Sequence, residues 1–334
     1  MSRAIATALD EVAAALGEGF RGVAERDYPV ATSTTYRLGG RAALYVEPGG
    51  PDDVARLGRA LREAGIDSAT TPILPLGRGS NLVVSDHGLP GVVIRMGAAA
   101  SWIEPAGRAL LDEGAAPGAA AEEWVRAGAA TSLPQLANWS ARRGLTGLEW
   151  AVAIPGSVGG AVRMNAGAYG SEMSDVLISA SVFDLCSLEL EDKDRTALEL
   201  RYRTSILTER HLVVAATFGL GPGDRRAIRA QMNSHRRHRA DTQPGGANNA
   251  GSVFKNPPGD SAGRLVESSG LKGRRVGGVR VSDLHANFFV AEPGAHAQDV
   301  YDLVHMVRAV VYERTGIDLE PEIRFVGRFS EAAE

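Results

Sequence analysis

The sequence predicts an α+β protein with more than one domain. Apolar residues recur at helical spacing near both ends of the chain, whereas the middle carries short runs of Val, Ile and Leu separated by Gly, Pro and Asp. Of the 334 residues, 44% are hydrophobic and 23% are charged, which is typical of a soluble globular protein. A chain of this length can form two or three domains with sizeable cores.

The N-terminal part is expected to form a small unit of helices and strands. Its first apolar residues follow helical spacing: Ile5, Leu9, Val12 and Leu16. Acidic residues lie between them, which predicts an amphipathic helix and excludes the continuous apolar core of an export signal. Residues 43–46 fit a short strand, and residues 51–64 fit a helix with one apolar face. We place the first domain at residues 1–95.

Strands dominate the expected second domain, residues 96–220. Strand-like runs occur from Leu74 to about Phe218, for example at residues 81–85, 91–96 and 178–185, and only the last of these lies wholly within this domain. The alanine-rich stretch at residues 114–121 is interpreted as a surface loop.

The third domain is expected at residues 221–318. Residues 227–239 have the pattern of a helix, and residues 300–312 predict another that ends near Gly316. The residues that follow, 319–327, fit a closing strand that can return to the first domain.

Charge and cysteine content exclude several classes of protein. Lys and Arg total 36 against 40 Asp and Glu, so no overall positive charge favours nucleic acid or an anionic membrane. No apolar run approaches the roughly 20 residues of a membrane span. Cys186 is the only cysteine, which excludes an intramolecular disulfide and a multi-cysteine metal site. We interpret it as a buried strand residue and expect a cytoplasmic protein without nucleic-acid, membrane or metal partners.

The segment LGRGSNLVVSD at residues 76–86 is the first candidate for a ligand site. It places small residues directly before a strand: Gly77, Gly79, Ser80 and Asn81. Backbone N–H groups in such a turn can approach an anion closely. A Rossmann fingerprint is excluded because Leu82 replaces the third glycine and a strand follows instead of a helix. A plain hairpin turn remains the alternative.

A second glycine-rich segment, IPGSVGGAVRMNAGAYG, occupies residues 154–170. Its hydrophobic residues indicate that it is ordered and buried. Many small residues in an ordered stretch favour backbone lying against a flat or extended ligand, with close strand packing as the alternative. The two segments together indicate a large cofactor that carries phosphate.

Three further segments carry reactive or charged side chains, although none is specific alone. Ser252 and Lys255 lie in GSVFKNP, where a hydroxyl and an ammonium group come within reach of one anionic ligand; a turn with a solvated lysine is the alternative. Arg201 and Arg203 flank Tyr202 in LRYRTS, and Glu322 lies in EPEIRF. For these, exposed strand faces are the simpler interpretation.

The densest basic run is His235 to Arg239, on or just after the helix expected at 227–239. Such a run is usually a solvated face, and a source of positive potential near a diphosphate is the alternative. The four tryptophans are not interleaved with basic residues, so no stacking on nucleic-acid bases is indicated.

Taken in order, these segments resemble the UDP-N-acetylenolpyruvoylglucosamine reductase family from about Thr34 to Gly327. The matching stretches are TTYRLGG, LGRGSNLVVSD, GLEWAVAIPGSVGGAVRMNAGAYG, YRTS, GSVFKNP, AGRLVESSGLKGRRVGG, HANFFV and EPEIRF. The resemblance implies a vanillyl-alcohol-oxidase-type fold, in which two N-terminal α/β units hold FAD and a C-terminal α/β domain binds the substrate.

The resemblance also implies roles for individual residues. Noncovalent FAD contacts are expected from Gly77, Gly79, Ser80, Asn81, Leu82, Pro155, Gly156, Ser157, Gly159, Gly160, Asn165 and Gly167. Hydride is expected to pass from flavin N5 to the enolpyruvyl group, with Ser252 as proton donor and with Arg203 and Glu322 stabilising the intermediate. Lys255 and Asn256 are expected to bind the substrate, UDP-N-acetylglucosamine enolpyruvate, and NADPH is the expected reductant.

Two features distinguish this chain within the family that it resembles. Asn165 to Asp175 lacks a long insertion, which resembles the shorter branch of the family that has no clamping loop. Ala291 stands where the family usually has asparagine. The alternative functions are another FAD-dependent oxidase of the same superfamily and a noncatalytic flavin- or UDP-sugar-binding protein.

Overall fold

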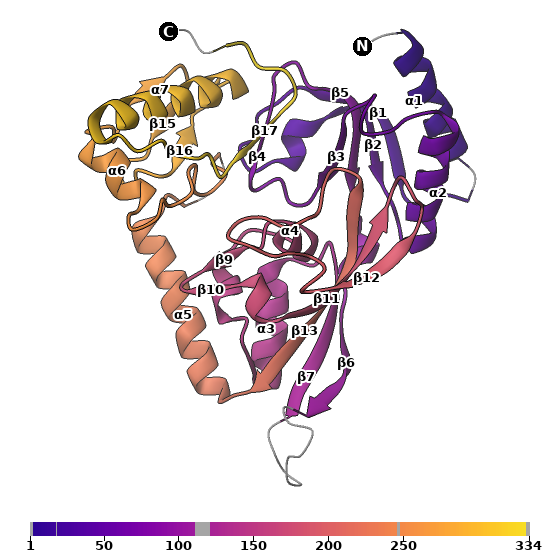
Figure 1. The fold of residues 1–334 in the computed structure, drawn as a ribbon, viewed down its shortest axis with the longest axis horizontal. Coiled ribbons are helices and arrows are strands. Elements are labelled where there is room, and N and C mark those ends of the chain that lie inside the picture. The colour runs from indigo at the N-terminus through magenta and orange to yellow at the C-terminus, as the bar shows by residue number, and fades with distance from the viewer. Residues whose placement is uncertain (1–2, 18, 111–120, 246–247, 332–334) are drawn as a thin grey trace. The chain divides into compact units, whose positions relative to one another are not determined.

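The computed structural model describes residues 3–17, 19–110, 121–245 and 248–331 (Figure 1). Its α-helices are α1 (Arg3–Ala15), α2 (Pro51–Glu63), α3 (Leu133–Arg143), α4 (Val158–Arg163), α5 (Arg225–Thr242), α6 (Ala262–Ser268) and α7 (Ala297–Thr315). Short 3₁₀ helices are η1 (Val30–Ser33), η2 (Ala98–Ala100), η3 (Glu149–Ala153) and η4 (Met173–Asp175).

The strands of the first half are β1 (Val23–Pro29), β2 (Arg41–Glu47), β3 (Ile73–Leu76), β4 (Leu82–Val84), β5 (Leu89–Arg95), β6 (Ile103–Leu110), β7 (Ala121–Gly128) and β8 (Leu145–Thr146). Those of the second half are β9 (Gly167–Ala168), β10 (Ser171–Glu172), β11 (Leu177–Asp184), β12 (Leu190–Asp194), β13 (His211–Pro222), β14 (Arg275–Val276), β15 (Val279–Val281), β16 (Phe289–Ala291) and β17 (Arg324–Val326). The expected α+β class is confirmed. Residues 114–120 of the expected surface loop lie outside the described residues, and Ala121 begins β7.

The chain divides into two compact units. The first comprises Met1–Glu25, Tyr45–Gly77 and Val93–Arg239, and the second comprises Arg26–Leu44, Arg78–Val92 and Ala240–Glu334. The three domains expected at residues 1–95, 96–220 and 221–318 stay a prediction. The strands nearest the N-terminus form a four-stranded sheet with the order β1–β2–β5–β3.

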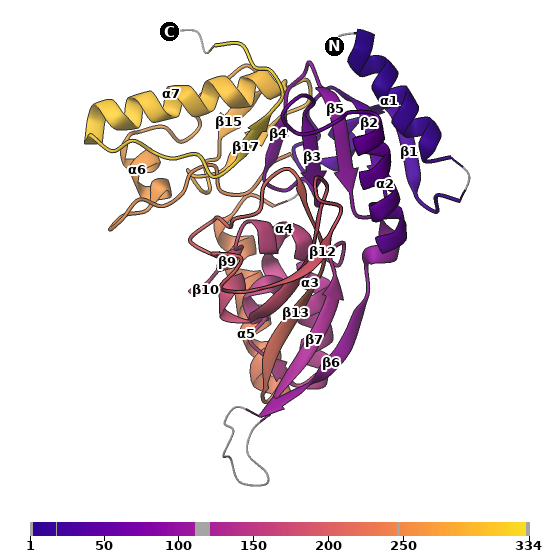
Figure 2. The ribbon, with the colours of Figure 1, turned by 45° about the vertical axis from the view of Figure 1, so that its right-hand side comes forward.

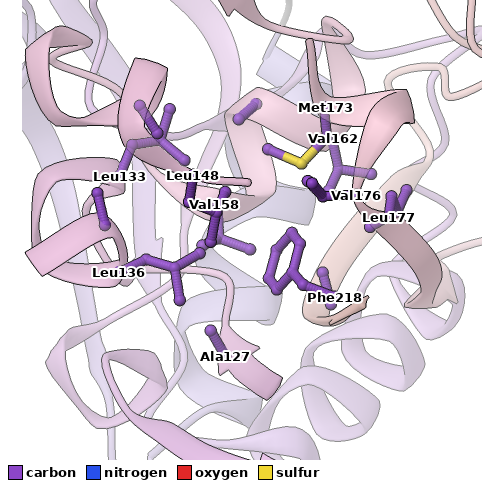
Figure 3. Close-up of a cluster of buried hydrophobic side chains, with 14 of the residues drawn as sticks. Ala127, Leu133, Leu136, Leu148, Val158, Val162, Met173, Val176, Leu177 and Phe218 are labelled. Carbon is purple, nitrogen blue, oxygen red and sulfur yellow. The ribbon is translucent and has the colours of Figure 1, made fainter. Parts of the chain in front are cut away.

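The first unit is organised around a sheet with the order β12–β11–β13–β7–β6, to which β8 adds by pairing with β13. The long strand β13 pairs antiparallel with both β11 and β7. Figure 2 shows α3 and α4 on one side of this sheet. The core between them is apolar: Leu133 and Leu136 of α3, Val158 and Val162 of α4 and Phe218 of β13 are buried together (Figure 3).

The helices of this unit follow the sequence pattern only in part. The amphipathic helix α1 buries Leu9 and Val12, and α2 buries Val54, Leu57 and Leu61, as expected. Helix α3 was not expected from the sequence pattern. It begins at a capping box, in which Ser132 Oγ accepts from the Gln135 N–H and the Gln135 side chain accepts from the Ser132 N–H.

The second unit contains α6, α7 and the antiparallel sheet β14–β15–β16. Its core includes Tyr36, Phe254 and Phe289, which are almost completely buried. The closing strand β17 pairs in parallel with β4, joining Arg324 to Leu82 and Val326 to Val84. It is shorter than the expected 319–327.

Helix α7 ends where the sequence predicts. Gly316 adopts a left-handed conformation, with φ of 71°, and its N–H donates to the Tyr312 carbonyl. The other end is held by Asp86, whose two carboxylate oxygens accept from the N–H groups of Ala297 and Gln298 at 3.0 Å each. Asp86 is the last residue of LGRGSNLVVSD, so this segment also orders the start of α7.

The interpretation of Cys186 as a buried strand residue is wrong. Strand β11 ends at Asp184, whose Oδ1 accepts from the N–H groups of Cys186 and Ser187 and turns the chain. Cys186 is therefore exposed. Within the described residues, no helix is long and apolar enough to cross a membrane.

Candidate functional site

The turn between β3 and β4 carries the first group of expected cofactor residues. Gly79 has φ of +61°, and a Cβ atom there would lie 2.3 Å from the Ser33 carbonyl oxygen, so only glycine fits. In the part of the chain that the structure describes, no backbone N–H of residues 78–81 donates a hydrogen bond. Consecutive free N–H groups beside a glycine that no side chain can replace suit a phosphate group.

Asn81 and Leu82 complete this turn. The Asn81 side-chain amide donates to the Glu322 carbonyl at 3.0 Å, and the Asn81 carbonyl accepts from the Arg324 N–H at 3.0 Å. Asn81 therefore fixes the turn to the segment that carries Glu322, and Leu82 follows it into β4.

Part of the second glycine-rich segment forms the short helix α4, which was not expected from the sequence pattern. Ser157 is its N-cap, and its Oγ accepts from the Gly160 N–H at 3.4 Å. A Cβ atom on Gly77 would lie only 2.8 Å from this Oγ. The structure thus brings Gly77, Ser157 and Gly160 together, within the first unit, as a surface without bulky side chains.

The remaining residues of this segment differ in their surroundings. Pro155 is exposed and Gly156 partly buried. Gly159 packs closely on Ala129, because an added Cβ would lie 3.1 Å from the Ala129 Cβ. At Gly159, and also at Gly77 with its contact to Ser157, the alternative of close packing therefore holds. An added Cβ at Gly160 would meet only Ser157 Oγ, at 3.5 Å, which leaves room for a close-lying ligand. The residues present fit an FAD pyrophosphate.

Asn165, Gly167 and Arg203 form one cluster in the first unit. Arg203 Nη2 donates to the Gly167 carbonyl at 2.8 Å, and Nη1 donates to the Asn165 carbonyl at 3.4 Å. Asn165 is completely buried; its Nδ2 donates to the Arg201 carbonyl at 3.0 Å, and its Oδ1 accepts from the Ser174 N–H at 2.9 Å. These bonds fix the position of Arg203.

The exposed-strand interpretation of Arg203 is replaced by a tight turn. Arg201 and Thr204 exchange both backbone hydrogen bonds at 3.1 Å, and Arg203 lies between them with φ of 58°. A non-glycine residue in this conformation is uncommon and is often found at functional sites. The guanidinium also lies over the Tyr202 ring, 4.8 Å from its centroid.

Ser252, Lys255 and Glu322 are brought together in the second unit by two extended segments. The Glu322 N–H donates to the Val253 carbonyl at 2.7 Å, and the Lys255 N–H donates to the Glu320 carbonyl at 2.9 Å. Ser252 and Glu322 are both partly buried. Their backbones therefore lie on neighbouring segments, with Ser252 one residue from the bonded carbonyl.

Lys255 and Asn256 are committed to contacts within the protein. Lys255 Nζ lies 2.6 Å from Glu320 Oε1, in an ion pair whose glutamate side chain is 69% exposed. Asn256 Oδ1 accepts from the Ala262 N–H at 3.0 Å and so positions the start of α6. An anionic ligand at Lys255 would share the ammonium with Glu320 or replace that glutamate.

Asn287 is a residue of this site that was not among the expected site residues. It is buried, its Oδ1 accepts from the Phe254 N–H at 2.9 Å, and its Nδ2 donates to the Phe254 carbonyl at 2.8 Å. Its own carbonyl accepts from the Val253 N–H. Asn287 therefore holds the segment that carries Ser252. A polar residue inside the apolar run HANFFV was the available signal.

Tyr169 was also missed as a candidate. Its hydroxyl donates to the His235 carbonyl at 3.0 Å, and its ring stacks on the His235 ring with centroids 4.0 Å apart. Burial raises the pKa of Tyr169, an effect that the nearby charge of Arg239 opposes. The β9–β10 hairpin thereby contacts the basic run on α5, which is not simply a solvated face.

Ala291, the residue that departs from the family pattern, ends β16. It is buried, and its backbone N–H donates to the Asn248 carbonyl at 2.9 Å. The loop that carries Asn248 is held at this point through the backbone of residue 291.

Known proteins are similar to this chain over most of its length. Residues 42–186 match a model described as "FAD binding domain", and residues 243–326 match "UDP-N-acetylenolpyruvoylglucosamine reductase, C-terminal domain". The UDP-N-acetylenolpyruvoylglucosamine reductase of Synechococcus sp. (strain WH7803) is 42% identical over 92% of this chain and 94% of that protein. That of Geobacter metallireducens is 40% identical over 95% of this chain and 99% of that protein.

A solved structure of a protein with the same function as these relatives is also similar to this chain. The crystal structure of UDP-N-acetylenolpyruvylglucosamine reductase from Thermus caldophilus superposes with a TM-score of 0.73 and 33% identity, covering 92% of this chain and all of that one. The chain belongs to the UDP-N-acetylenolpyruvoylglucosamine reductase family.

Proposed function

We propose that this chain catalyses the NADPH-dependent reduction of UDP-N-acetylglucosamine enolpyruvate to UDP-N-acetylmuramate, a step of peptidoglycan precursor synthesis. The observation that carries the proposal is the near-complete coverage of family relatives at about 40% identity. The FAD-binding match and the small-residue surface around Gly77 and Ser157 support FAD as the cofactor. When bound, FAD supplies the redox chemistry by taking a hydride from NADPH and passing it to the enolpyruvyl group.

The protein is proposed to hold FAD through two backbone surfaces. The free N–H groups of residues 78–81 suit the pyrophosphate, and the glycines around Ser157 permit close approach of a flat group. Asn165 and Gly167 are proposed to lie close to the flavin, since their side chain and backbone are fixed by the Arg203 cluster.

Arg203 is proposed to stabilise charge on the substrate. Adding hydride to the terminal carbon of the vinyl ether places negative charge on the adjacent carbon and on its carboxylate. A fixed guanidinium needs little reorganisation to stabilise that charge, and one well-aimed donor is typically worth about 3 kcal/mol. The hydrogen bonds of Arg203 to Asn165 and Gly167 support this role because they hold the side chain in place.

Ser252 is proposed to deliver the proton that completes the reduction. The proton goes to the carbon next to the carboxylate, so the double bond gains one hydride and one proton. A serine hydroxyl is a weak acid and needs polarisation by its neighbours. Glu322 and Lys255 are proposed to provide it. The Glu322 N–H donates to the Val253 carbonyl, and Asn287 holds Phe254 between Val253 and Lys255.

Further assignments belong to the same proposal. Lys255 and Asn256 are proposed to contact the anionic substrate, and the cytoplasm is the proposed location. The division into three domains, at residues 1–95, 96–220 and 221–318, is also proposed, with the closing strand returning to the first domain.

Purified protein provides the test of this function. The protein should be yellow, acid should release all the flavin to the supernatant, and NADPH oxidation should depend on the enolpyruvyl substrate. Rapid reoxidation by air of dithionite-reduced protein, without such dependence, would favour an oxidase. Bound flavin with neither activity would favour a noncatalytic binding protein.

A further inference from the structure

The first unit contains a pocket of about 470 Å³ between the outward face of α3 and the residues that lead into β6. Two tryptophans and several polar side chains line it, including Trp102, Gln135, Asn138, Trp139 and Arg142. The α3 residues among them recur at helical spacing and therefore share one face of the helix. None of the lining residues is acidic.

Hydrogen bonds fix the amide side chains of this pocket. Gln135 Oε1 accepts from the Ser132 hydroxyl at 2.8 Å, and Asn138 Oδ1 accepts from Arg236 Nη2 at 3.0 Å. Asn138 Nδ2 in turn donates to the Pro134 carbonyl at 2.6 Å. The acceptor atoms are thus already used, whereas the Arg142 guanidinium stays available as a donor.

Of three guanidinium groups near this pocket, one lines it and two contact residues that line it. Arg142 lines it, Arg143 lies over the Trp139 ring at 3.5 Å from the centroid, and Arg236 bonds to Asn138. In the part of the chain that the structure describes, none of the three forms an ion pair with a carboxylate. The surface is therefore locally positive although the chain carries a net charge of −4.

Helix α5 extends this positive surface. Its exposed arginines are Arg225, Arg226, Arg229, Arg236 and Arg237, and Arg236 contacts α3 through Asn138. The two helices are connected where the Gly223 N–H donates to the Gly144 carbonyl at 2.7 Å. Clustered positive charge raises the local concentration of anions nearby.

We propose that this pocket binds a nucleoside diphosphate, at a site separate from the residues proposed for the reductase reaction. Both indole rings are partly exposed, and each has a guanidinium over one face: Arg143 lies 3.5 Å from the Trp139 centroid, and Arg126 lies 5.8 Å from the Trp102 centroid. A base can stack on the opposite face of such a ring, and guanidinium groups bind phosphate oxygens through paired N–H groups. The volume lies within the range of small-ligand pockets, roughly 300–1,000 Å³. The absence of acidic lining residues removes the group that would repel the phosphates.

The surroundings argue against a membrane or a protein partner. Among the described residues of α3 and α5, no large hydrophobic side chain is exposed. A helix that inserts into a lipid surface needs such residues, and so does the buried centre of a protein interface. Charge and stacking without apolar exposure favour a small anionic ligand with a flat ring.

The test is calorimetric titration of FAD-loaded protein with ADP, GDP, CDP and UDP, in the presence of saturating UDP-N-acetylmuramate. The product occupies the proposed active site, so nucleotide binding there is suppressed. At least one nucleotide should bind with one equivalent per chain, and the corresponding nucleoside and pyrophosphate alone should bind about tenfold more weakly or less. Failure of the reductase activity would leave this titration interpretable, because it measures no turnover.

Charge reversal at the pocket provides the decisive comparison. Arg142→Glu should weaken nucleotide binding by about tenfold or more, and Trp139→Leu should do the same through lost stacking. Arg59→Glu, an exposed arginine on α2, is the matched control and should bind as wild type does. FAD content and turnover of Arg142→Glu should be unchanged. The proposal is overturned if none of the four nucleotides binds, or if binding survives Arg142→Glu unchanged.

Discussion

Arg203 Nη2 donates a hydrogen bond of 2.8 Å to the Gly167 carbonyl, so a cation from one segment is fixed on the backbone of the glycine-rich segment. A Cβ atom at Gly167 would lie 2.5 Å from the Ser171 carbonyl oxygen, which keeps this position free of any side chain. The guanidinium is therefore held before any substrate arrives. Such preorganisation gives a cation its value for charge that develops during a reaction.

Replacing Arg203 should slow substrate reduction far more than it slows reduction of FAD by NADPH. Arg203→Ala removes the cation and should cost about 3 kcal/mol, or roughly 100-fold in rate. Arg203→Lys keeps the charge but cannot donate to both carbonyls through one planar group, so only partial rescue is expected. Stopped-flow measurement of both half-reactions provides the comparison. Arg201→Ala, whose side chain is 75% exposed, is the control and should behave as wild type.

Lys255→Ala should weaken sugar-nucleotide binding without affecting the reduction of FAD. Loss of one charge-assisted contact should cost about 1.5–3 kcal/mol and raise KM accordingly. Lys272→Ala is a matched control, because Lys272 forms a comparable surface ion pair with Glu267 at 2.7 Å. Equal losses in both half-reactions would mean that Lys255 shapes the cofactor site instead.

Glu320→Gln tests the ion pair of Lys255 separately. Removing the Glu320 charge frees the ammonium from its partner 2.6 Å away, so KM should fall or stay unchanged. A rise in KM as large as that of Lys255→Ala would show that the pair itself, and not the lysine charge, recognises substrate.

The sequence predicts helices well where apolar spacing and an end signal agree. Helix α7 combines regular apolar residues with Gly316 and was predicted within three residues at either end. Helix α4 was missed because two glycines favour irregular backbone. Tertiary contacts decide it: the Val158 N–H donates to the Thr131 carbonyl, and that of Gly159 donates to the Ala129 carbonyl.

The candidate site also has parts that the sequence predicts and parts that it does not. The glycine-rich turns could be read from the residues, because a glycine such as Gly79 is needed where the backbone leaves no room for a side chain. The positive φ of Arg203 could not, since no local rule places arginine there. The roles of Ser252 and Glu322 came only from the family resemblance, because their proximity depends on the long-range contacts of Asn287 and Asn81.

Asp86→Ala should lower thermal stability. Its carboxylate accepts from two N–H groups at the start of α7, where its negative charge also interacts favourably with the positive end of the helix dipole. Losing such a cap costs about 1–2 kcal/mol, or roughly 2–4 °C in Tm for each kcal/mol. Glu313→Ala, on the exposed side of the same helix, should leave Tm unchanged. An unchanged Tm for Asp86→Ala would show that α7 needs no cap from this segment.

His211 should make the protein less stable as the pH falls. Burial lowers the pKa of His211, and the nearby Asp184 only partly opposes this. Its Nδ1 accepts from the Thr208 N–H at 3.0 Å, which requires the neutral ring. Because the folded pKa lies below the unfolded value of about 6.5, the contribution is fully present above that pH and is lost as pH falls below it.

Comparison with His211→Gln checks this sign. The stability difference between wild type and variant, measured from urea midpoints, should shrink between pH 7.5 and pH 5.5. A difference that grows over this interval would mean that the ion pair with Asp184, at 3.7 Å, outweighs burial.

Ser252→Ala should abolish the proton-transfer step and leave the rest of the enzyme intact. The change removes one oxygen, and the backbone around it is held by Asn287 and the Glu322 N–H, so FAD content and Tm should stay as in wild type. The NADPH half-reaction should also be unchanged. The second half-reaction should fall by about 100-fold or more, in line with the loss of a general acid. Glu322→Gln should damage the same step.

The decisive measurement for Ser252 is rapid mixing of pre-reduced Ser252→Ala protein with enolpyruvyl substrate in the absence of oxygen. In deuterated solvent, the wild-type rate should fall because the proton delivered by the serine exchanges with solvent, whereas the variant should show a smaller effect or a different one. Reoxidation at the wild-type rate, with UDP-N-acetylmuramate formed, would remove Ser252 from the mechanism. Glu322 or water would then be the acid, and a further loss in the Ser252→Ala, Glu322→Gln double variant would distinguish the two.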